Sequence, residues 1–193
     1  MRAFVAIDLA DEIRAALARE QSRLQTACGR DRDLRWTRPE GLHLTLKFLG
    51  AVENERVASV MAALRALERF DPFKVEVEGF GFFPDARRPR VLWVGVEAPP
   101  ALSELAARVE TALEGLGFAR EGRPFKPHLT LARFERPHAA PALTSAIEHS
   151  PGSFGAFEVS EFFLFESRRR PGGAEYFKLA RFPASPSAPE RLS

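Results

Sequence analysis

The chain has 193 residues, of which 45% are hydrophobic and 28% charged, enough apolar material to bury a core as one compact domain or two small lobes. Lysine and arginine together number 28 against 26 aspartate and glutamate, and a formal charge of +2 excludes a histone-like polycation. One cysteine, Cys28, and four histidines exclude a disulfide framework and argue against a thiol-rich zinc site. The first residues lack the long apolar stretch of a signal peptide, and no window has the length of a membrane span, so we expect a cytoplasmic protein.

The spacing of apolar residues predicts that the two halves of the chain share one order of elements: strand, helix, strand, helix, strand. In the first half we expect strands over residues 4–9, 43–49 and 73–82, and helices over 11–27 and from Asn54, whose side chain would cap the second helix. In the second half we expect strands over residues 90–96, 128–134, 156–165 and 175–182, and helices over 100–116 and 141–149.

Two similar halves predict an α+β protein with a duplicated, two-lobed fold. Two antiparallel-type sheets would face a central groove, with the helices on the outer faces. We expect a single domain over residues 1–182, with pseudo-symmetric lobes built mainly from residues 1–83 and 90–182. The tail, residues 183–193, is rich in proline and serine and is expected to be disordered. The sequence shows no heptad repeat and no large apolar patch that would indicate a dimer, so we expect a monomer.

The tetrapeptide His-Leu-Thr-Leu occurs twice, beginning at His43 and at His128, in the same predicted strand of each half. Alternate side chains of a strand share a face, so Thr45 should lie beside the first histidine and Thr130 beside the second. The intervening leucines would point into the helix-covered layer. Paired imidazoles suit acid–base chemistry near neutral pH, and hydroxyl groups donate hydrogen bonds to phosphate oxygens. The motif therefore indicates phosphoryl chemistry.

Two cations follow the motifs. Lys47 lies two residues after Thr45 and should share its face. Strand alternation places Arg133 on the same face as the leucines, and its side chain would reach the same site only where the strand ends or twists.

Further basic residues cluster around aromatic side chains. Arg30, Arg32, Arg35 and Arg38 surround Trp36; Arg120, Arg123 and Lys126 flank Phe125; and Arg168, Arg169 and Arg170 form a third cluster, expected in a loop. Cations with an aromatic side chain nearby suit a single-stranded RNA end.

Competing chemistries lack their motifs. The sequence contains no HExxH, no GxSxG, no P-loop and no GxGxxG, and neither His-x-Thr motif includes a cysteine or a carboxylate. We therefore expect no metal and no cofactor. The remaining histidines, His138 and His149, are expected to be ordinary solvent-exposed residues.

The doubled motif resembles that of the two-histidine (2H) phosphoesterase superfamily. With its flanking residues, the chain resembles the bacterial and archaeal 2′-5′ RNA ligase family, also described as RNA 2′,3′-cyclic phosphodiesterases. The matching segments are residues 2–7, 35–36, 43–50, 90–93 and 124–133.

The resemblance implies an enzyme that opens a terminal 2′,3′-cyclic phosphate on RNA and leaves a 2′-phosphomonoester, without a metal. His128 would deprotonate the attacking water and His43 would protonate the departing 3′ oxygen, while Thr45 and Thr130 hold the phosphate. In reverse, a 5′-hydroxyl RNA end would replace water and give a 2′-5′ linkage without ATP. The residues alone leave the two histidines interchangeable, so these roles come from the resemblance.

Two alternatives remain open. One keeps the chemistry but takes a small cyclic nucleotide or an ADP-ribose-derived cyclic phosphate, whereas the other is an RNA-binding module without turnover. The two unbroken His-x-Thr pairs argue against the binding module, and the arginine clusters favour RNA over small nucleotides.

Overall fold

The computed structural model describes residues 1–29, 31–67, 70–170 and 173–185. In this part of the chain the strands are β1 (Arg2–Asp8), β2 (Leu34–Trp36), β3 (His43–Ala51), β4 (Phe73–Phe83), β5 (Val91–Glu97), β6 (His128–Phe134), β7 (Ser153–Val159), β8 (Glu161–Arg170) and β9 (Gly173–Pro183). The helices are α1 (Asp11–Cys28), α2 (Asn54–Arg65), α3 (Pro100–Glu114) and α4 (Pro141–Glu148), with one 3₁₀ turn, η1 (Pro39–Gly41). None of these helices is long and apolar enough to cross a membrane.

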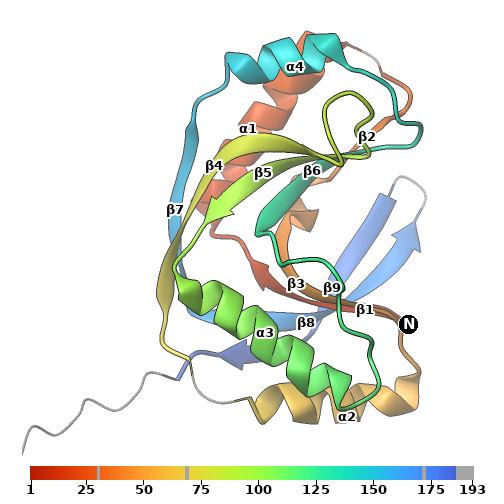
Figure 1. The fold of residues 1–193 in the computed structure, drawn as a ribbon, viewed down its shortest axis with the longest axis vertical. Helices are drawn as coiled ribbons and strands as arrows, with labels where there is room; N and C mark the ends of the chain where they lie inside the picture. Colours follow the sequence, from red (N-terminus) through yellow and green to blue (C-terminus); the bar gives the residue numbers. More distant parts are fainter. Residues whose placement is uncertain (30, 68–69, 171–172, 186–193) are drawn as a thin grey trace, which may run out of the picture.

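The strands form one curled antiparallel sheet in the order β7-β4-β5-β6-β3-β1-β8-β9, with β2 added beside β6 (Figure 1). The two motif strands, β3 and β6, are neighbours at its centre, where Leu44 pairs with Leu129. The boundary between these two strands divides the sheet into two four-stranded halves, β7-β4-β5-β6 and β3-β1-β8-β9. The predicted duplicated α+β architecture is confirmed, with the two predicted sheets joined edge to edge. Each half contains strands from both parts of the chain, so the halves of the sheet do not coincide with residues 1–83 and 90–182.

The helices bury one face of this sheet. Helix α1 packs with α4 and against β7, while α3 packs with α2 and against β3 (Figure 1). Their buried side chains recur at helical spacing, as Leu17 and Leu24 do in α1 and Leu105 and Val109 in α3. The leucines of both motifs are buried under this helical layer. The histidines and threonines therefore face the opposite side of the sheet.

Three local predictions were wrong, and one strand was missed. The predicted strand over residues 156–165 is two strands separated by Ser160, because β7 pairs with β4 in one half of the sheet and β8 with β1 in the other. Strand β2 was not predicted, since three residues are too short to show alternation. Asn54 is the first residue of α2; the N-cap is Glu53, and no side chain caps the helix. The arginines at 168–170 end strand β8 instead of occupying a loop. Residues 186–193 of the predicted disordered tail lie outside the described residues.

Each motif strand contains a β-bulge at the same position. In β3, Thr45 pairs with Ala6 and Lys47 pairs with Val5, so Leu46 is an extra residue. An extra residue shifts the alternation of the strand by one. Leu46 and Lys47 are consequently both buried, and Phe48 emerges on the groove side with 64% of its surface exposed.

Strand β6 repeats this arrangement. Thr130 pairs with Trp93 and Ala132 pairs with Leu92, which leaves Leu131 as the extra residue. Leu131 and Ala132 are both fully buried, and Arg133 emerges on the groove side. The bulge is therefore the irregularity that places the Arg133 side chain on the groove side of the sheet.

The same bulge overturns the prediction that Lys47 shares the face of Thr45. The Lys47 side chain is 2% exposed and lies under the sheet, where its Nζ is 2.7 Å from Oε2 of Glu110 in α3. It also donates to the carbonyl oxygen of Ala119 at 2.8 Å. Lys47 thus ties β3 to the helical layer and contributes no cation to the groove.

We predict that Lys47→Met lowers the free energy of unfolding by about 3 kcal/mol, because it leaves a partly buried carboxylate without its partner. Replacing Glu110 by Met as well should recover most of that loss. Urea denaturation measures both effects. Arg120→Met breaks an exposed pair with Glu114 and is the matched control, with an expected change below about 1 kcal/mol. An equal loss in the control would contradict this role of Lys47.

Candidate active site

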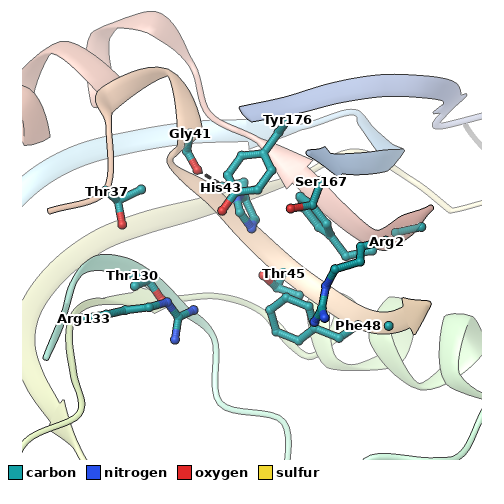
Figure 2. Close-up of a pocket in the computed structure, with 13 residues that line it drawn as sticks. Arg2, Thr37, Gly41, His43, Thr45, Phe48, Thr130, Arg133, Ser167 and Tyr176 are labelled. Atoms are coloured by element: carbon teal, nitrogen blue, oxygen red, sulfur yellow. Dashed lines mark hydrogen bonds between the residues drawn. The ribbon is translucent and has the colours of Figure 1, made fainter. Parts of the chain in front are cut away.

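A pocket of about 170 Å³ opens on the groove face of the sheet where β3 and β6 meet (Figure 2). Its lining comes from five strands and the segment before β3: Arg2, Ala3, Phe4, Thr37, Gly41, His43, Thr45, Phe48, Gly50, Thr130, Arg133, Ser167 and Tyr176. Figure 2 shows the hydroxyls of Thr45 and Thr130 and the guanidinium groups of Arg2 and Arg133 around one space.

The pairing of β3 with β6 brings the two motifs together. With Leu44 opposite Leu129, the antiparallel register places His43 across from Thr130 and Thr45 across from His128. Directly opposite residues have neighbouring side chains on one face of a sheet. The pairing therefore brings the two motifs side by side. His43, Thr45 and Thr130 line the pocket, whereas His128 is not among its lining residues.

A backbone carbonyl holds each imidazole in the same way. Nδ1 of His43 lies 2.7 Å from the carbonyl oxygen of Gly41, and Nδ1 of His128 lies 2.7 Å from that of Lys126. Because a carbonyl oxygen only accepts hydrogen bonds, Nδ1 must carry the proton in both rings. Each neutral histidine then has its lone pair on Nε2, ready to accept a proton.

The turn that supplies the Gly41 carbonyl is itself fixed. Arg14 of α1 donates to the carbonyl oxygen of Pro39 at 2.6 Å and to that of Leu42 at 3.2 Å, and it forms an ion pair with Asp8. These contacts tie the backbone on both sides of Gly41 to the first helix.

Aromatic rings pack around both imidazoles. The His43 ring lies 4.6 Å from Phe4 and meets Tyr176 edge-on at 5.1 Å between centroids. His128 meets Phe83 edge-on at 4.9 Å. This packing restricts the rotation of each ring and removes water from it.

Burial lowers the pKa of both histidines. It lowers the pKa of His43 to about 4, with a further decrease from Arg133, while the Gly41 carbonyl and the Asp8 carboxylate act in the opposite direction. The pKa of His128 is also lowered, first by burial and then by the charges of Arg133 and Lys126. Both rings are therefore expected to be mainly neutral at pH 7, and a bound anion would favour their protonated forms.

Most of the predicted arginine clusters are neutralised by neighbouring carboxylates. Arg35 pairs with Glu135, Arg120 with Glu114, Arg123 with Glu121, Arg168 with Glu166 and Arg170 with Glu175. Arg30 lies outside the described residues. Trp36 and Phe125 pack against the hydrophobic core and do not line the pocket.

The two other histidines lie away from the pocket. His149 is exposed, as predicted, and its Nδ1 lies 2.9 Å from the Ser145 carbonyl oxygen. The prediction of an ordinary exposed residue was wrong for His138, which is half-buried with its Nε2 2.8 Å from Oδ2 of Asp31. Among the described residues, no three His, Cys, Asp or Glu side chains gather as a metal site would require.

Several pocket residues were not predicted from the sequence. Arg2, Ser167 and Tyr176 come from β1, β8 and β9, and Phe48 follows the first bulge. The first three reach the pocket through long-range strand order, which has no local signal. Phe48 stands at the position of the first motif strand that Arg133 occupies in the second, so comparison of the two motifs would have suggested it.

A family model described as LigT like phosphoesterase matches the chain twice, over residues 7–93 and 94–176. A protein of Archaeoglobus fulgidus named RNA 2′,3′-cyclic phosphodiesterase is 38% identical over 183 residues, which cover 94% of this chain and 99% of its own. A protein of Methanothermobacter thermautotrophicus with the same name is 34% identical over 184 residues, covering 94% and 98%.

Solved structures show the same fold. The crystal structure of TT0787 of Thermus thermophilus superposes with a TM-score of 0.77 at 32% identity, covering 95% of this chain and 97% of that one. The structure of E. coli LigT complexed with 3′-AMP has a TM-score of 0.78 at 28% identity, covering 96% and 98%. These similarities confirm the resemblance that the doubled motif indicated.

We predict that the histidines titrate in a distinct order in the unliganded protein. The midpoint of His43 should lie near pH 4 and that of His128 below 6.5, because burial disfavours the imidazolium ion. His138 should titrate above 6.5, because the Arg136 carbonyl and Asp31 favour its charged form. NMR titration of the imidazole Cε1 protons, assigned with single His→Gln variants, measures all three. A His43 midpoint at or above 6.5 contradicts the described burial of the ring.

Proposed function

The chain belongs to the LigT-like phosphoesterase family, and from this membership we propose that it hydrolyses the 2′,3′-cyclic phosphodiester ends of RNA to 2′-phosphomonoesters. One observation carries the proposal: two imidazoles, each with its Nδ1 proton held by a backbone carbonyl, share one sheet face with two threonine hydroxyls. Such a pair provides one group to accept a proton and a second to donate one.

In this proposal His128 accepts the proton of the attacking water on Nε2, and His43 donates a proton to the departing 3′ oxygen. Two of the surrounding charges support the assignment: Lys126 lowers the pKa of His128, and the Asp8 carboxylate favours the protonated form of His43. Arg133 lowers the pKa of both histidines. Because burial outweighs Asp8, we expect His43 to become the donor when the phosphodiester anion is bound.

The phosphate would be held by groups that face the pocket. Thr45 and Thr130 offer hydroxyl donors to the non-bridging oxygens, and Arg133 offers a guanidinium group able to bind two oxygens at once. These donors stabilise charge that the phosphate carries through the displacement. The proposal requires no metal and no cofactor. With a 5′-hydroxyl RNA end in place of water, the same two histidines would form a 2′-5′ linkage: the 5′ oxygen bonds to the phosphorus of the cyclic end, and the bond to the 3′ oxygen breaks.

We infer that residues 1–182 form one phosphoesterase domain that acts as a monomer in the cytoplasm. The continuous sheet supports a single domain, and the absence of a dimer pattern in the sequence supports a monomer. The intracellular nature of an RNA substrate supports the cytoplasmic location.

We predict that the wild-type protein converts an RNA oligonucleotide ending in a 2′,3′-cyclic phosphate to the 2′-phosphate in the presence of EDTA. His43→Ala and His128→Ala should each lower kcat about 100-fold or more, because each removes one proton-transfer group. Analysis of the labelled product by chromatography after nuclease digestion measures both rate and product. His149→Ala, on the exposed end of α4, is the matched control.

Each outcome of that assay separates one alternative. Full activity in either of the two active-site variants would exclude the two-histidine mechanism, and strict dependence on an added divalent cation would exclude a metal-independent reaction. Turnover of cyclic mononucleotides or ADP-ribose-derived cyclic phosphates without turnover of RNA would identify the small-molecule alternative. Binding of RNA without turnover of any substrate would identify a binding module.

We predict that kcat/KM falls as the pH rises from 6.5 to 8. The reaction needs one protonated and one neutral histidine, and kcat/KM reports the free enzyme, in which both pKa values are lowered below 6.5. Above the higher of these values, the singly protonated pair declines with each further pH unit. Initial rates at low substrate concentration measure the profile. A value of kcat/KM that rises through this range would contradict the proposal that the reacting enzyme has one protonated and one neutral histidine.

A further inference from the structure

The β8–β9 hairpin borders the pocket through Ser167 and Tyr176, and the three arginines at the end of β8 are not equivalent. Strand β8 alternates regularly: Phe163 and Phe165 pack with Phe4 on the groove side, whereas Phe162 and Leu164 belong to the main core under the helices. Ser167 continues the groove side and lines the pocket. By the same alternation Arg169, two residues further, projects on the groove side as well.

Arg168 and Arg170 fall on the other side of the hairpin, where carboxylates hold them. Arg168 lies 2.7 Å from Glu166 and stacks over the Phe177 ring at 4.5 Å. Arg170 lies 3.4 Å from Glu175. In the backbone pairing of the hairpin, Glu175 lies directly opposite Arg168. These contacts place all five side chains on one face, opposite to the pocket.

Arg169 has a different environment. It lies opposite Ala174 in β9, which offers no polar group, and among the described residues its guanidinium has no hydrogen bond or ion pair. It is exposed to solvent. Its charge is therefore available to a ligand that extends out of the pocket.

Three arginines lie on the groove side of the sheet. Arg133 lies in the pocket at the end of the second motif strand, and Arg2 lines the pocket opposite Ser167 on the neighbouring strand. Arg169 lies two residues beyond Ser167, about 7 Å further along the strand. That step is close to one nucleotide of an extended strand.

We propose that Arg169 binds the phosphate of the nucleotide that precedes the cyclic end, so that the β8–β9 hairpin makes the enzyme prefer an RNA strand to a cyclic mononucleotide. This inference rests on the proposed phosphodiesterase activity, because it concerns how the same site selects its substrate. A mononucleotide has no preceding phosphate and gains nothing from Arg169. Arg168 and Arg170 take no part in the contact.

The test compares Arg169→Ala with Arg168→Ala and Arg170→Ala on two substrates: a five-nucleotide RNA with a 2′,3′-cyclic end and a 2′,3′-cyclic mononucleotide. Arg169→Ala should lower the ratio of kcat/KM for RNA over kcat/KM for mononucleotide about fivefold, whereas the two control variants keep the wild-type ratio. Removal of one phosphate contact should also reduce the slope of log kcat/KM for RNA against log salt by about 0.7, and Arg169→Lys should restore the slope.

The outcomes separate this inference from the activity on which it depends. If the wild-type protein hydrolyses neither substrate, the proposed function fails, whatever the variants show. If it hydrolyses RNA but Arg169→Ala keeps the wild-type ratio and salt slope, or if Arg168→Ala or Arg170→Ala lowers them equally, the role of Arg169 is overturned while the activity stands.

Discussion

The site depends on one backbone constraint, the pairing of Leu44 with Leu129 where the two halves of the sheet meet. A shift of one residue in either motif strand would turn its histidine and threonine into the helical layer and expose its leucines. Those leucines are fully or almost fully buried, so the hydrophobic core enforces the register. The groove chemistry is thus a consequence of core packing: the apolar residues fix the face on which the polar ones appear.

The β-bulge after each threonine determines which of the following side chains face the groove. It repeats in both motif strands, but the residues it redirects differ, as Lys47 and Phe48 in one strand stand where Ala132 and Arg133 stand in the other. Duplication therefore supplies the paired histidines and threonines, while the residues after the bulge make the two sides unequal. One side presents an aromatic surface and the other a guanidinium group. The same inequality places Arg133 near both imidazoles and lowers the pKa of each.

Sequence periodicity located the helices and most of the strands, and it placed each motif histidine on the same strand face as its threonine, because alternation and helical spacing are local properties. It located the strand His128–Phe134 and the buried leucines of both motifs. It was wrong about Lys47 because a bulge depends on the partner strand, which alternation within one strand does not show. It joined β7 to β8 because the chain passes between opposite halves of the sheet at Ser160 without a glycine or proline to mark the change. Arg2 and Tyr176 were missed because strand order, a long-range property, brings them to the pocket.

We infer that both motif imidazoles carry their proton on Nδ1 and present Nε2 to the groove. Two-bond ¹H–¹⁵N correlation spectra of the histidine side chains at neutral pH test it directly, with His43 and His128 assigned through single His→Gln variants. We expect Nδ1 to be the protonated nitrogen in both residues, held by the carbonyl oxygens of Gly41 and Lys126. A proton on Nε2 in either residue would contradict it, because that nitrogen would then be unable to accept a proton from water, and the hydrogen bond that orients the ring would be absent.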